Sequence, residues 1–100
     1  MVLSVAALAQ NTGQTWAERK CVLYQRAVTD ATKMIGRDRL RDAFIKKNQE
    51  FITGGCLTQG NVCPMTDGEF EFANLLTVMT MNEGMASTFV PFGCRDTAGE

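Results

Sequence analysis

The chain contains no histidine, which removes several kinds of catalytic and metal site at once. Histidine is the usual general base near neutral pH, a common zinc ligand and the partner of the nucleophile in Ser-His and Cys-His sites. Serine is also scarce, because only Ser4 and Ser87 occur and neither has an activating base nearby in the sequence. The sequence therefore predicts a protein that is not an enzyme and that binds no metal and no cofactor.

The chain also lacks an excess of positive charge. Its net charge of −1 at pH 7 argues against nucleic acid as a partner, because such domains usually carry a clear basic excess. The charge is unevenly distributed: residues 1–56 hold nine Lys and Arg against five acids, net +4, and residues 57–100 hold one against six, net −5. Either the two halves attract each other or solvate their own faces, or one half presents a charged surface to a partner.

No apolar run reaches the roughly 18 residues that a membrane-spanning helix needs. Residues 1–9 are apolar and end in Ala7-Leu8-Ala9, a small-x-small pattern typical of the end of a secretory signal peptide. The alternative is an apolar amino terminus that packs on the domain. We expect an exported protein, periplasmic or secreted, with no membrane span.

The length and composition predict one small globular domain. The chain has 100 residues, of which 45% are hydrophobic and 21% charged. We expect residues 10–14 to form a disordered lead, residues 15–96 a single helical domain and residues 97–100 a tail. A core of this size leaves a modest stability, to which covalent cross-links would add.

Four cysteines in a small, exported chain are typical of two disulfides. A zinc site of four thiolates is the main rival, but it would need short Cys-x2–4-Cys pairs, whereas Cys56 and Cys63 have six residues between them. No Cys-x-x-Cys redox pair occurs. We therefore expect Cys21, Cys56, Cys63 and Cys94 to form disulfides.

Two helices are predicted in the first half of the chain. Thr15 and Glu18 form a capping box for a helix over 15–35, which Gly36 ends. Asp38 is the expected N-cap of a second helix, which ends at Gly54-Gly55. Such closely joined helices must be antiparallel neighbours. Residues that face each other then share a midpoint at the turn, and Cys21 with Cys56 satisfies this condition, which leaves Cys63 with Cys94.

A third helix is expected to begin at a second capping box, Thr66-Asp67-Gly68-Glu69, and to end near Gly84. About 18 helical residues span roughly 27 Å, and nine extended steps from Met85 to Cys94 cover roughly 30 Å. The return can therefore bring Cys94 back to Cys63. The predicted fold is all-α, with about three helices, an irregular C-terminal return and two disulfides.

The loop over 57–69 and the acidic start of the third helix form the predicted contact surface for a partner. Negative charge at a helix N-terminus is also explained by the helix dipole alone. The chain further contains six methionines, for which core packing is the default and an adaptable binding surface the alternative. The predicted partner-binding residues are Gln59, Asn61, Asp67, Glu69 and Glu71.

Four features over about a third of the chain resemble small periplasmic helical immunity proteins, which neutralise cell-wall amidases delivered by type VI secretion. These features are Cys63-Pro64, the Thr66-x-x-Glu69 helix start, the long helix that follows and the closing Pro91-Phe92-x-Cys94. The resemblance implies a disulfide-bonded helical protein that blocks an enzyme's cleft with an exposed loop.

The leading hypothesis is thus a small exported binding protein, an inhibitor or immunity protein that acts by occluding a partner enzyme such as a hydrolase. The alternative is a periplasmic stress or chaperone-like protein with a client surface rich in Met and Phe. A thiol enzyme, the third class, would need a reactive Cys56 or Cys63. A homodimer is the other assembly that we consider.

Overall fold

The computed structural model describes residues 14–58 and 61–94 and shows a small all-α domain. Its elements are α2 (Trp16–Ile35), the 3-10 helix η1 (Arg37–Arg39), α3 (Asp42–Thr53) and α4 (Asp67–Asn82). Within the described ranges there is no β-strand, and the isolated bridge between Val62 and Phe92 is the closest approach to one. The predicted fold class is confirmed. The predicted signal segment 1–9 and the tail 97–100 lie outside the described residues.

Helix α2 begins and ends as the sequence predicts. The Thr15 hydroxyl accepts from the amide of Glu18, and the Glu18 carboxylate accepts from the amide of Thr15, which completes the capping box. The helix ends at Gly36, whose φ of 105° is a conformation that favours glycine. One face of α2 is buried, through Tyr24, Ala27 and Ala31.

Helix α3 begins three residues later than predicted, with Arg41 instead of Asp38 as its N-cap. The amides of Arg39 and Leu40 donate to the carbonyls of Gly36 and Arg37, so this segment forms the short 3-10 helix. Leu40 is then extended and only 4% exposed. The buried, extended Leu40 separates the 3-10 helix from α3. Arg41 is the N-cap of α3 and makes no side-chain hydrogen bond there.

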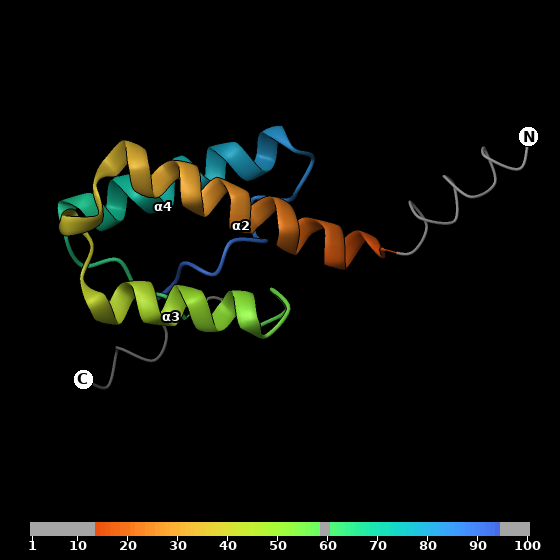
Figure 1. The fold of residues 1–100 in the computed structure, drawn as a ribbon, viewed down its shortest axis with the longest axis horizontal. Helices are drawn as coiled ribbons and strands as arrows, with labels where there is room; N and C mark the ends of the chain where they lie inside the picture. The colour runs from red at the N-terminus through yellow and green to blue at the C-terminus, as the bar shows by residue number, and fades with distance from the viewer. Residues whose placement is uncertain (1–13, 59–60, 95–100) are drawn as a thin grey trace, which may run out of the picture.

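The three α-helices form two layers (Figure 1). Helices α2 and α4 lie side by side and antiparallel, and α3 lies across from this pair. The chain after α4 turns back between α3 and the α2–α4 pair, where it is drawn in blue. None of the described helices is long and apolar enough to cross a membrane.

The C-terminal return completes the core with two aromatic rings. Phe89 makes edge contacts with Tyr24 of α2 and Phe51 of α3. Phe92 stacks on Phe44 of α3 and contacts Phe72 of α4 at its edge. The return therefore joins all three helices, although it contains no helix of its own.

One polar pair lies inside this core. The hydroxyl of Tyr24 donates a hydrogen bond to the side-chain oxygen of Asn48, and both residues are buried. Burial raises the pKa of Tyr24 far above its ordinary value and outweighs the hydrogen bond to Asn48, which lowers the pKa, so the phenol remains a donor. This pair connects α2 to α3 where direct contacts between the two helices are few.

Both predicted disulfides are present. Cys21 of α2 joins Cys56, which follows the end of α3, with an S–S distance of 2.06 Å. Cys63 joins Cys94 at the end of the return, with an S–S distance of 2.12 Å. All four cysteines are therefore paired. Such pairs are compatible with a periplasmic or extracellular location.

Candidate protein-binding site

The predicted contact residues that the structure describes differ in their exposure to solvent. Asp67 is exposed at the start of α4, and Glu71 is half-exposed in an ion pair. Glu69 is completely buried, so it cannot contact a partner directly. Asn61 is partly buried, and Gln59 lies outside the described residues. Of the acidic group, Asp67 and Glu71 remain accessible to a partner and Glu69 does not.

Glu69 instead holds three segments of the chain together. Its carboxylate accepts from the backbone amide of Arg41 at 2.8 Å, from the Arg41 guanidinium at 2.8–3.0 Å and from the amide of Met65 at 2.9 Å. The guanidinium also donates to the carbonyl of Cys63 at 3.2 Å. A buried carboxylate needs such full pairing, because an unpaired charge in the interior is costly.

The second capping box is therefore only half formed. The hydroxyl of Thr66 accepts from the amide of Glu69 as predicted. The Glu69 carboxylate is directed to Arg41 and Met65 rather than back to the amide of Thr66. A tertiary ion pair has replaced the local hydrogen bond.

The basic and acidic halves of the chain attract each other at this junction. Besides Arg41 with Glu69, Arg39 makes a two-pronged ion pair with Glu71 at 2.8 and 3.2 Å. Thr66 also donates to the carbonyl of Arg39 at 3.3 Å. At this junction, basic residues of the first half and acidic residues of the second half form ion pairs that hold the start of α3 against the start of α4.

Gly68 permits the close approach of these two segments. A Cβ at this position would lie 2.7 Å from both the Cβ and the backbone oxygen of Arg39. At a solvent-exposed position inside a helix, Gly→Ala raises the free energy of unfolding by up to about 1 kcal/mol. Here we expect Gly68→Ala to lower the free energy of unfolding by about 1–3 kcal/mol, because the backbone must move apart.

Urea denaturation checks this prediction, with Asn74→Ala as the control. Asn74 is exposed in the same helix, and its replacement should stabilise slightly through helix propensity. A Gly68→Ala protein that is as stable as the parent or more stable would show that the contact with Arg39 is not tight.

The junction should also make stability depend on pH. Burial raises the pKa of Glu69, but the hydrogen bonds from Arg41 and Met65 outweigh it and hold the pKa below its ordinary value of 4.5. A lowered folded-state pKa stabilises the fold above pH 4.5, and this stabilisation is lost as the pH falls through the folded-state pKa. The parent should therefore lose stability between pH 5 and pH 3.

Glu69→Gln tests the source of this loss. We expect the urea midpoint of this variant to change less than that of the parent over the same pH range. Glu71→Gln is the matched control, because Arg39 lowers the pKa of Glu71 as well but the pair is exposed to solvent. If Glu69→Gln and the parent have the same pH dependence, another carboxylate is responsible.

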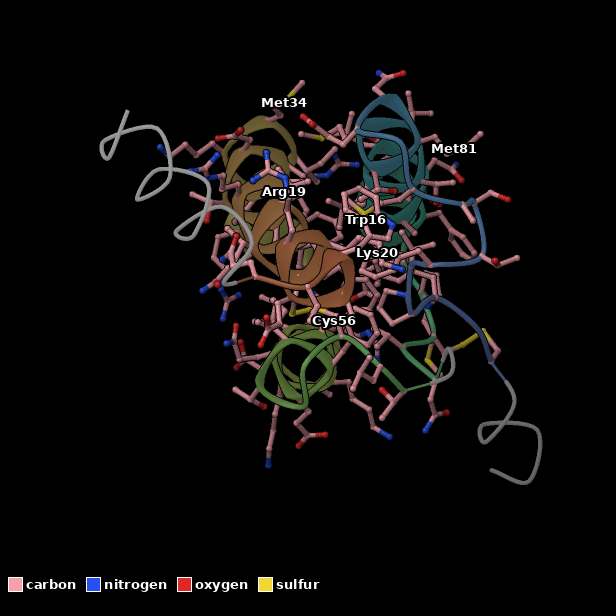
Figure 2. All side chains as sticks on the ribbon, turned by 90° about the vertical axis from the view of Figure 1, so that its right-hand side faces the viewer. Trp16, Arg19, Lys20, Met34, Cys56 and Met81 are labelled. Carbon is pink, nitrogen blue, oxygen red and sulfur yellow. A yellow bond between two sulfur atoms is a disulfide. The ribbon has the colours of Figure 1, made fainter. Side chains whose placement is uncertain are left out.

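The structure corrects the expectation that the methionines fill the core. Met85 is buried and Met79 packs partly against the core, but Met34, Met65 and Met81 are 68%, 51% and 50% exposed. Met34 and Met81 lie on the outside of the α2–α4 pair, away from α3 (Figure 2). The sequence indicated this alternative through the number of methionines, but it did not show which of them are outside.

A second exposed group lies at the start of α2. The Nζ atom of Lys20 is 5.9 Å from the ring centre of Trp16 and 5.1 Å from that of Phe89. Trp16 is half-exposed. The side chains of Trp16 and Lys20 lie close together at one end of the domain (Figure 2). The lysine therefore covers part of two aromatic rings, and this group is less apolar than the outside of α4.

The loop before α4 borders a pocket of about 230 Å³ beside α3. Lys47, Glu50 and Asn61 are among its lining residues, and the side-chain oxygen of Asn61 is buried with no hydrogen-bond partner.

Among the described residues, no group of three or more Cys, Asp or Glu side chains is arranged to hold a metal ion. The described part of the surface instead carries several large, exposed apolar side chains that a partner could contact.

Comparison with protein-family models, curated proteins and solved structures finds no match to this chain.

Proposed function

We propose that this chain is a small exported binding protein that inhibits a partner enzyme by covering part of its surface. A cell-wall hydrolase is the proposed partner class. The observation that carries this proposal is the number of large apolar side chains that a disulfide-linked domain leaves outside. Seven such residues in the described part of the chain are at least 50% exposed: Trp16, Met34, Leu57, Met65, Phe70, Val78 and Met81.

Single exposed apolar residues are ordinary, but grouped aromatic, Met and aliphatic side chains are typical of contact surfaces. Two disulfides and a packed aromatic core hold the backbone that carries them. A surface fixed before binding loses less conformational entropy when the complex forms. Both features support a binding role.

The test is an inhibition assay with the oxidised protein. Cell-wall amidases of the class that type VI secretion delivers are mixed with increasing amounts of the protein, and the release of peptidoglycan fragments is measured. We expect one of them to lose activity in proportion to the protein added until the two are equimolar. Reduced and alkylated protein is the control. Full amidase activity at a saturating excess of the oxidised protein would rule out the inhibitor function for this class.

A chaperone-like role is the second candidate, and the exposed methionines favour it. Met side chains repack easily and suit surfaces that accept several partners. Because the chain has no histidine, an acid-activated form would have to depend on carboxylates such as Glu69.

Dye binding and client protection separate this role from inhibition. A chaperone-like protein should bind a hydrophobic dye more strongly at pH 3 than at pH 7 and should keep a denatured model protein in solution at the lower pH. Dye binding that is unchanged from pH 7 to pH 3, together with no protection, would contradict it.

A further inference from the structure

The outer face of α4 is apolar over most of the helix. Phe70, Val78 and Met81 are 52%, 56% and 50% exposed, and Asn74 is exposed between them. Their positions follow the spacing i, i+4, i+8 and i+11, which places all four on one side of an α-helix. We call these four residues the α4 outer stripe.

This stripe is not needed for the core of the domain. The opposite side of α4 is buried through Phe72, Ala73 and Leu76, and it packs mainly on α2. A helix of this kind normally places polar side chains on its outside. Three large apolar residues in that position are therefore available to another molecule.

The charged side chains of α4 itself and of its C-cap are all negative. Helix α4 contains no Lys or Arg, and Asp67 at its first position and Glu83 at its C-cap lie at the two ends. Glu71 is paired with Arg39, but Asp67 and Glu83 make no ion pair within the part of the chain that the structure describes. A partner gains electrostatic energy here by placing basic groups near Asp67 and Glu83.

This charge pattern argues against a second copy of the chain as the occupant. Antiparallel pairing of two α4 helices would place Asp67 of one copy near Glu83 of the other, and parallel pairing would place Asp67 against Asp67. Either arrangement brings like charges of α4 together, and Arg39, the base beside the start of α4, is already paired with Glu71 of its own copy.

We infer that the α4 outer stripe docks into an apolar groove of a different protein, one bordered by Lys or Arg side chains. The inference builds on the binding role proposed above and assigns it to α4 instead of the 57–69 loop. Phe70 and Met81 are of the residue types most enriched in interface cores. Recognition then follows the helix-in-groove mode, in which side chains at helical spacing enter the groove of the partner.

Val78→Asp is the test variant and Val22→Asp the matched control. Both residues are exposed valines within helices, at 56% and 41%, and Val22 lies on α2. Circular dichroism and the absence of free thiols verify that each variant is folded. We expect Val78→Asp to inhibit the target amidase at least about tenfold more weakly than the parent, and Val22→Asp to inhibit like the parent. Inhibition by the parent should also weaken as NaCl rises from 0.05 to 0.5 M.

A photo-crosslinking residue at position 78, with position 22 as the control, gives an answer even if no amidase is inhibited. In the native host we expect an adduct only from position 78, with the cross-linked peptide of the partner apolar and flanked by Lys or Arg. An adduct of twice the chain mass, or none at all, overturns the inference. Equal inhibition by parent and Val78→Asp also overturns it while leaving the inhibitor function intact.

Discussion

Arg41→Ala should lower the free energy of unfolding by about 3 kcal/mol, although Arg41 belongs to neither the core nor an exposed binding surface. Its guanidinium neutralises Glu69, which is completely buried. Removal of one partner of a buried ion pair usually costs about 3–5 kcal/mol. We expect the lower end, because the side chain of Arg41 is 38% exposed and water can enter where it lay.

Glu69→Ala should cost less, about 2 kcal/mol. The guanidinium that remains can be hydrated, whereas the amides of Arg41 and Met65 lose their acceptor. Urea denaturation at pH 7 measures both changes. Glu71→Ala is the control, since it removes an exposed pair and should change stability far less. If Glu71→Ala is as destabilising as Arg41→Ala, burial is not the reason that the junction is stable.

Loss of the Cys21–Cys56 disulfide should have an effect of similar size. The bond joins residues 35 apart, and the entropy of closing a loop of this length corresponds to about 3–4 kcal/mol. For a domain of this size that predicts a melting temperature lower by more than about 10 °C. The double variant Cys21→Ala, Cys56→Ala avoids an unpaired thiol, and calorimetry measures the change.

The second disulfide provides the comparison that identifies the cause. Cys63 and Cys94 are 31 residues apart, so loop entropy alone predicts nearly the same loss. Cys56 is buried and Cys94 is exposed, so packing would instead make the first pair cost more. A loss of under about 1 kcal/mol in either double variant would contradict the entropic account.

The helices and disulfides could be predicted because their signals are local or geometric. Thr15 and Glu18 determine where α2 begins, and Gly36 determines where it ends. Each of these signals involves only a few neighbouring residues. The disulfide pairing followed from the antiparallel arrangement of the two helices. Helix α3 was placed too early, because the burial of Leu40 depends on tertiary packing that no pattern in residues 36–41 indicates.

The exposure of the candidate contact residues was harder to predict, for two physical reasons. Glu69 follows the local pattern of a capping residue, and only the fold brings Arg41, 28 residues away in the sequence, to its carboxylate. Helix α4 is apolar on nearly all sides, so its sequence does not distinguish the face that packs on α2 from the face that carries Phe70, Val78 and Met81. Burial, which decides both cases, is a property of the whole chain.

The order of the two disulfides along the chain bears on how the protein is oxidised. Four cysteines can pair in three ways, and the native pairing joins the first to the second and the third to the fourth. A polypeptide that enters an oxidising compartment amino end first presents its thiols in that order. Cys21 and Cys56 are then both present well before Cys94 emerges, so pairings that involve Cys94 do not compete at first with the native bond. The buried face of α2 packs mainly on α4, which emerges after Cys56. The first disulfide can therefore close before the domain is completely folded.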